Sequence, residues 1–283
     1  PGAEAVRGIP GLPFEYVTPR LTVLLPEPGK RNGAFVLVVP GGGYMYCSAM
    51  GGEGFQAAEW LRDRGIGAAV LQYRRNIFQD KDKNLNRVYD ANVALEDAMR
   101  SMRIVRSHAG EWGIAPDRIG VMGFSAGGHI AATMAVHPMA GDPAAADVLG
   151  RFPTRPDFMI LAYPLICMAP PWGGARWRDN LPGENFAPQL AEYYSCQRFV
   201  TPETPPAFIV TAGDDFTVQD SQAMVDAMRE KRIPCEFHLF ERGGHGYGMT
   251  KPDHPVTDCW PGLLENWFKR RGIIPADTER THP

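Results

Sequence analysis

A serine flanked by glycines is the residue of this chain best placed to act as a nucleophile. Residues 123–127 read Gly-Phe-Ser-Ala-Gly, which matches the Gly-x-Ser-x-Gly pattern of a nucleophile elbow. A serine hydroxyl is a weak nucleophile, so a sharp turn must present Ser125 and a base must activate it. The same pattern can arise by chance in a chain with 31 glycines. An apolar strand expected at 118–122 and a helix of small residues expected at 126–136 favour the elbow.

The base that such a serine requires must come from seven histidines. His245 is favoured because it follows an expected strand at 236–240 and has glycines on both sides. A loop with that freedom can bring an imidazole ring to Ser125. His129 and His238 lie within predicted elements and are interpreted as structural. His137 and His254 precede prolines in loops and are interpreted as solvated.

Two adjacent carboxylates are candidates to orient the histidine. Asp214 and Asp215 follow an expected strand at 207–211. The C-terminal end of a strand is the edge of the sheet where a loop histidine can meet a carboxylate. The aspartate that does not bind the histidine is expected to be a turn or helix-capping residue.

Three consecutive glycines upstream of the serine predict an oxyanion hole. They occupy residues 41–43 and follow an expected buried strand at 34–39. A glycine leaves its N–H uncovered, so a substrate carbonyl oxygen can approach within hydrogen-bond distance. We expect the N–H groups of Gly42 and Gly43 to act together with that of Ala126. Tyr44, with Met45 and Tyr46 after it, is expected to contact substrate and to crowd the acyl side of the pocket.

Composition excludes several other classes of function. The chain has 283 residues and a formal net charge of −3, so it carries no basic field to bind nucleic acid or an anionic membrane. No apolar stretch approaches the length of a membrane span. Five scattered cysteines argue against a disulfide framework, and no zinc-ligand spacing is present. We therefore expect neither a metal nor another cofactor.

The predicted elements give an α/β fold. Strands at 21–25 and 34–39 are expected to form a first hairpin, after which strands and helices alternate. Such alternation predicts a mostly parallel central sheet with helices on both faces, in a single domain over residues 1–283. A segment rich in Pro, Trp and Tyr at 166–205 is expected as an insertion near the active site. Within it, Trp172 and Trp177 could stack on a sugar ring or an aryl acyl group, or could instead pack the insertion's own small core.

These motifs together resemble the carbohydrate acetylesterase and acetyl xylan esterase branch of the α/β-hydrolases, which includes bacterial feruloyl esterase-type (BD-FAE) domains. The resemblance rests on residues 39–44, 111–114, 123–129, 204–206 and 243–248. It implies an α/β-hydrolase fold with Ser125 as nucleophile and His245 as base. The Asp-x-x-Val spacing from Asp215 to Val218 is typical of this superfamily and favours Asp215 over Asp214. Two departures are Pro40, where the usual lipase and esterase loop begins with histidine, and Gly52, where relatives often have histidine before Glu53.

The sequence therefore predicts a serine carboxylic-ester hydrolase that works through an acyl-enzyme. The favoured substrate is a short acyl ester, and acetyl above all, on a plant cell-wall carbohydrate such as xylan. A feruloyl esterase, a general short-chain carboxylesterase or a peptidase on the same fold is the alternative. A catalytically inactive hydrolase fold used for binding is a further alternative, which would require that a member of the triad be missing.

Overall fold

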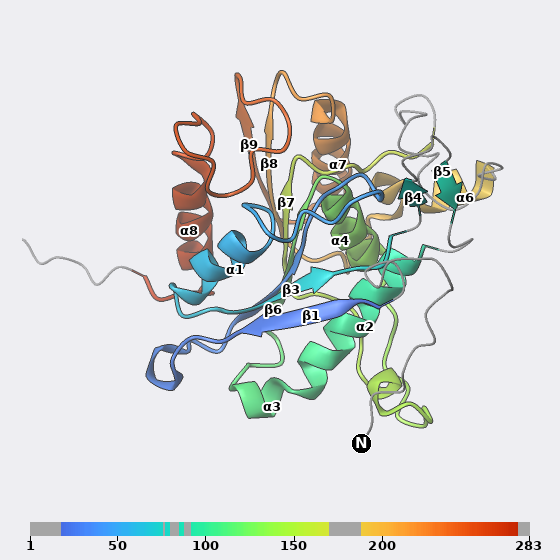
Figure 1. The fold of residues 1–283 in the computed structure, drawn as a ribbon, viewed down its shortest axis with the longest axis vertical. Coiled ribbons are helices and arrows are strands. Elements are labelled where there is room, and N and C mark those ends of the chain that lie inside the picture. The colour runs from blue at the N-terminus through green and yellow to red at the C-terminus, as the bar shows by residue number, and fades with distance from the viewer. Residues whose placement is uncertain (1–17, 76, 80–84, 88–91, 170–187, 277–283) are drawn as a thin grey trace, which may run out of the picture.

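The computed structural model describes residues 18–75, 77–79, 85–87, 92–169 and 188–276 (Figure 1). Its centre is a seven-stranded sheet in the order β1-β3-β2-β6-β7-β8-β9. The strands are β1 (Arg20–Leu24), β2 (Phe35–Val39), β3 (Gly67–Gln72), β6 (Ile119–Phe124), β7 (Met159–Ala162), β8 (Ala207–Ala212) and β9 (Cys235–Phe240). All neighbouring pairs are parallel except β1 and β3. The predicted mostly parallel sheet is confirmed.

The expected hairpin between the first two strands is wrong, because β3 lies between β1 and β2. Every residue of β2 is buried, whereas β1 alternates between exposed and half-buried positions. A strand buried on both faces needs a partner at each edge, and β2 finds them in β3 and β6. The half-exposed β1 is suited to the edge of the sheet. A separate two-stranded antiparallel sheet, β4 (Ile77–Gln79) and β5 (Leu85–Arg87), was not predicted.

Helices cover both faces of the large sheet (Figure 1). On one face lie α2 (Val93–Ser107), α4 (Ala126–Val136) and α7 (Val218–Glu230), and their apolar residues join Phe35, Leu37 and Val39 in one buried cluster. On the other face lie α1 (Phe55–Arg62) and α8 (Trp260–Arg270), which bury Val36 and Val38. The shorter helices are α3 (Ala109–Trp112) and α6 (Pro188–Tyr193), with 3₁₀ turns at Pro28–Lys30, Val148–Arg151 and Cys196–Phe199. Consecutive residues of β2 thus face opposite cores, as the pleat requires.

The C-terminal ends of the parallel strands gather the candidate residues at one edge of the sheet. The glycine loop follows β2, Ser125 follows β6, Asp214 and Asp215 follow β8, and His245 lies in the loop after β9. Parallel strands present their C-terminal ends on the same side, which is where open α/β sheets bind ligands.

The segment at 166–205 is described only in part. Trp172 and Trp177 lie outside the described residues. Of the aromatic residues that are described there, Tyr193 stacks on His137 with ring centroids 4.0 Å apart, and the Tyr194 carbonyl accepts a hydrogen bond from His129. These two tyrosines pack within the fold, and neither is among the residues that line the pocket described below.

Candidate active site

Ser125 occupies a strained turn between β6 and α4. Its φ of 51° and ψ of −118° are unusual for a residue with a side chain, and such conformations cost on the order of 1–3 kcal/mol. Neighbouring backbone holds the turn: Ser125 N donates to Ala162 O at 3.0 Å, and Ser125 O accepts from Leu165 N at 3.1 Å. The flanking glycines are sterically required. A Cβ on Gly123 would collide with the carbonyl oxygen of Gly127, and one on Gly127 with that of Val39.

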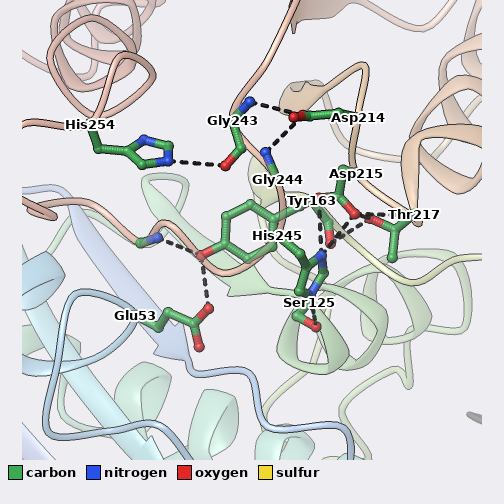
Figure 2. A network of polar contacts seen from close by, with 11 residues as sticks. Glu53, Ser125, Tyr163, Asp214, Asp215, Thr217, Gly243, Gly244, His245 and His254 are labelled. Atoms are coloured by element: carbon green, nitrogen blue, oxygen red, sulfur yellow. Dashed lines mark hydrogen bonds and ion pairs between the residues drawn. The ribbon is translucent and has the colours of Figure 1, made fainter.

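Ser125, His245 and Asp215 form a hydrogen-bonded chain with His245 in the middle (Figure 2). His245 Nε2 is 2.8 Å from Ser125 Oγ, and His245 Nδ1 is 2.9 and 3.0 Å from the two carboxylate oxygens of Asp215. An ionised carboxylate can only accept, so Nδ1 carries the proton and Nε2 accepts from the serine hydroxyl. The Asp215 side chain is fully buried and also accepts from the backbone N–H of Thr217 at 2.8 Å. This is the geometry of a Ser-His-Asp triad.

Asp214 binds the backbone of the loop that carries His245. Its Oδ1 accepts from Gly243 N and Gly244 N, both at 2.8 Å, and these bonds hold its pKa below the usual value. The loop that carries His245 is held again by His254, whose Nε2–H donates to Gly243 O at 3.0 Å. Asp214 lies in a turn, as expected, although it caps no helix; the expectation of a solvated His254 is wrong. Both residues fasten the histidine loop.

The glycine loop and Ser125 both line a cavity of about 620 Å³. Gly42 and Gly43 line this cavity together with Ser125 and His245. The N–H of Gly41, the first glycine of the loop, donates to Glu53 Oε2 at 3.1 Å. Ala126 is the first residue of α4, and the N–H groups of a helix's first turn have no acceptor within the helix.

Tyr44 does not contact the cavity, which corrects the expectation that it binds substrate. Its side chain is fully buried, and its hydroxyl is hydrogen-bonded to His129 Nδ1. His129 Nε2–H donates to Tyr194 O at 2.7 Å, and burial lowers the pKa of His129 to about 4. The structural role expected for His129 is thus confirmed. Tyr44 therefore fastens the glycine loop to α4. The loop thus has a side-chain anchor even though Pro40 stands where related loops begin with histidine.

The cavity wall is formed largely by the segment between the glycine loop and α1. Met45, Tyr46 and Met50 supply apolar surface, and Glu53 supplies a carboxyl group. Burial raises the pKa of Glu53 above its usual value. Phe216 lies next to the cavity, with its ring centroid 4.2 Å from that of His245 and its side chain largely exposed. Neither Glu53 nor Phe216 was predicted from the sequence to have a role in the site. Phe216 directly follows the two candidate aspartates in the sequence, and this proximity was the one sign that it could lie near the site.

Among the described residues, no three His, Cys, Asp or Glu side chains are grouped so that they could hold a metal ion. None of the helices in the described part of the chain is both long enough and apolar enough to cross a membrane.

The fold and the triad geometry are those of the serine hydrolases built on an α/β sheet, and sequence comparison agrees. A family profile described as the alpha/beta hydrolase fold matches residues 89–249, which is more than half of the chain. A second profile, BD-FAE, matches residues 21–142. The chain belongs to the α/β-hydrolase fold family.

Two of the similar proteins have names that refer to xylan. Endo-1,4-beta-xylanase B of Butyrivibrio fibrisolvens is 35% identical over 232 residues, which cover 80% of this chain and 34% of the relative. An acetylxylan esterase of Xylanibacter ruminicola is 32% identical over 92% of this chain and 49% of the relative. This chain thus spans less than half the length of either relative.

The similar solved structures include one that matches over nearly the whole length of both chains. It is the acetyl ester-xyloside bifunctional hydrolase from Caldicellulosiruptor lactoaceticus, with a TM-score of 0.83 and 32% identity. The match covers 96% of this chain and 94% of that one. The predicted resemblance to the acetyl xylan esterase branch is therefore confirmed.

Proposed function

We propose that the protein is a serine esterase that removes acetyl groups from a carbohydrate such as xylan. The observation that carries the proposal is the hydrogen-bonded chain from Ser125 through His245 to Asp215, of which Ser125 and His245 line a cavity together with Gly42 and Gly43. The similarity to an acetylxylan esterase and to an acetyl ester-xyloside hydrolase supports the choice of acyl group and alcohol. No member of the triad is missing, which argues against an inactive binding protein.

The reaction proceeds in two acyl transfers. Ser125 Oγ attacks the ester carbonyl carbon while His245 Nε2 takes the hydroxyl proton, and Asp215 stabilises the imidazolium that forms. The carbonyl oxygen becomes an oxyanion, which the N–H groups of Gly42, Gly43 and Ala126 stabilise. His245 then gives its proton to the departing sugar oxygen, leaving an acetyl group on Ser125. Water repeats the attack with the same base, releasing acetate and restoring the serine.

The cavity wall favours a small acyl group and leaves room for a sugar. Met45 and Tyr46 come just after Tyr44 in the chain and line the cavity, so a long acyl chain would have to displace them. A volume of about 620 Å³ is far larger than an acetyl group needs, and the remaining space suits the alcohol portion. The exposed ring of Phe216 beside His245 offers a face on which a sugar ring could stack.

Acyl-length profiling tests the proposal. A pocket discriminates by roughly 1–3 kcal/mol per misfitting methylene, about 10–200-fold, so kcat/KM should fall steeply from nitrophenyl acetate to butyrate and become negligible at octanoate. Acetate should be released from acetylated xylan, with little ferulate from feruloylated arabinoxylan. Ser125→Ala should lose several orders of magnitude in kcat while keeping its fold. A preference for feruloyl or octanoyl esters would refute the acetyl assignment, and undiminished turnover by Ser125→Ala would refute the triad.

A further inference from the structure

Tyr163, the residue after β7, contacts both the loop of His245 and the segment that carries Glu53. It is fully buried, with a φ of 38°. Its hydroxyl donates to Glu53 Oε1 at 2.8 Å and accepts from Gly248 N at 2.8 Å. Figure 2 shows Tyr163 between Glu53 and His245. A single phenol group therefore joins two loops that lie far apart in the sequence.

The rest of Tyr163 contacts the triad. The edge of its ring packs against His245, with centroids 4.9 Å apart and planes inclined by 64°. The carbonyl oxygen of Tyr163 lies 3.2 Å from the hydroxyl oxygen of Thr217, Oγ1. The Thr217 hydroxyl is in turn 3.0 Å from Asp215 Oδ1. A shift of Tyr163 would therefore move the surroundings of both His245 and Asp215.

Glu53 continues the connection to the glycine loop. Its second oxygen, Oε2, accepts from Gly41 N at 3.1 Å, directly before the two glycines assigned to the oxyanion. The space is tight, since a Cβ on Gly41 would lie 2.8 Å from Glu53 Oε2 and 3.1 Å from the Cβ of Ser125. The segment of Glu53 is also fixed by the bond from Met249 N to Gly52 O, at 3.1 Å. One carboxyl group thus links the glycine loop to Tyr163.

We propose that Glu53 and Tyr163 are a positioning pair that fixes the glycine loop relative to His245. The inference rests on the proposed function, because it assigns the pair a role in the same reaction. Oxyanion donors act only when they lie at hydrogen-bond distance from the oxygen of the tetrahedral intermediate. The proton acceptor must be in place at the same moment. A misplacement of about 1 Å can cost about 100-fold in rate, so a rigid link between the two loops contributes directly to turnover.

Three variants separate the link from the charge. Tyr163→Phe keeps the ring against His245 but removes both hydrogen bonds of the hydroxyl. Glu53→Ala removes the bonds to Gly41 and to Tyr163 together. Glu53→Gln keeps the shape without the charge: its amide oxygen can accept from Gly41 N, and its amide nitrogen can donate to the Tyr163 oxygen. This reverses the bond to Tyr163, so the hydrogen of the Tyr163 hydroxyl loses its acceptor.

Tyr247→Phe is the matched control. Tyr247 is a neighbouring buried tyrosine whose ring centroid lies 4.4 Å from that of Tyr163. Its hydroxyl has no hydrogen-bond partner among the described residues. The substitution therefore removes the same group from the same environment without breaking a link.

Two rates should be measured on each folded variant, below its thermal midpoint. One is the hydrolysis of nitrophenyl acetate, separated into kcat and KM, and the other is the phosphonylation of Ser125 by a phosphonate ester. Tyr163→Phe and Glu53→Ala should each lose about 10–100-fold in kcat and in phosphonylation, with KM changed by less than about 3-fold. Glu53→Gln should recover part of this loss, and Tyr247→Phe should match the wild type.

Several results would overturn the proposal. A loss confined to KM would make Glu53 a substrate contact, and a Glu53→Gln variant as impaired as Glu53→Ala would make the charge, not the link, the essential property. Wild-type rates in Tyr163→Phe would remove the pair from the reaction altogether. Failure of the proposed function looks different. In that case the wild type would still be phosphonylated but would release no acetate from xylan, and the phosphonylation rates would continue to test the pair.

Discussion

Asp214 and Asp215 are adjacent carboxylates with opposite environments. Asp215 is buried and bonded to His245, whereas Asp214 is exposed and bonded to the backbone of the loop that carries His245. The Asp-x-x-Val spacing favoured Asp215 from the sequence. The contact of Asp214 was not predictable in this way, because its partners lie 29 and 30 residues further along the chain.

Asparagine at each of these positions should have unequal effects. In Asp215→Asn the amide can donate to Nδ1, which stabilises the wrong tautomer of His245, and kcat should fall by about 10⁴-fold with little change in KM. Asp214→Asn keeps an oxygen that can accept from Gly243 and Gly244, so kcat should stay within a few-fold of the wild type. Steady-state kinetics on nitrophenyl acetate gives the ranking, and the reverse order would transfer the orienting role to Asp214.

Residues with local motifs were predictable, and those that act over long sequence separations were not. Ser125 and His245 each lie in a glycine-rich run directly after a strand, so type and position pointed to the same chemistry. Glu53 and Tyr163 are 110 residues apart, and neither has a neighbour in sequence that signals the other. Their hydrogen bond depends on how β7 and the segment before α1 are placed by the fold.

At the scale of elements, most predicted strands and helices agree with the structure to within a few residues. The helix expected over 89–108 instead begins at Val93, because the Asn92 side chain accepts from Leu95 N at 3.2 Å and caps it. The first hairpin failed for a different reason. Periodicity identifies a strand and its buried face, but the pairing of β1 with β3 is set by which edges remain open after the parallel strands assemble.

The helix α7 carries a buried carboxylate that holds the start of the segment at 166–205. Asp220 Oδ1 accepts from Ile166 N and Cys167 N, both at 2.7 Å. Burial raises its pKa from the usual 3.8 to about 6. An acid whose pKa is raised by folding binds its proton more tightly in the folded state, so its contribution to stability falls as pH rises from about 4 to about 6.

Replacing Asp220 with asparagine should remove this pH dependence. The amide oxygen can still accept both backbone bonds, since they share one oxygen, and no charge remains to be buried. The difference between the two pKa values corresponds to about 3 kcal/mol. The free energy of unfolding of Asp220→Asn, relative to that of the wild type, should therefore rise by up to about this amount between pH 4 and pH 7. Urea unfolding at several pH values measures it, and a pH-independent difference would contradict the assignment.

At the scale of the whole molecule, one sheet contributes to two cores. The residues of β2 alternate between the cluster under α2, α4 and α7 and the cluster under α1 and α8. Neither core can form without the shared sheet. We propose on this ground that the chain is a single domain, as the absence of a linker in the sequence also indicates.

A single domain of this kind should unfold in one cooperative transition. Calorimetric and van't Hoff enthalpies should agree, and far-ultraviolet and near-ultraviolet dichroism should change at the same temperature. Two resolved transitions, or a part of the chain that stays folded after limited proteolysis while the other is lost, would contradict the proposal.

The close packing around Gly123 and Gly127 affects how this part of the sequence can change during evolution. The collisions that exclude a side chain at Gly123 and Gly127 involve main-chain oxygens, and they are the same whether or not residue 125 carries a hydroxyl. A homologue that lost its catalytic activity would still need both glycines in order to fold, whereas Ser125 could be replaced without harm to the fold. The glycine spacing therefore records ancestry of the fold. The residues at positions 125, 215 and 245 would distinguish an active enzyme from a catalytically inactive homologue.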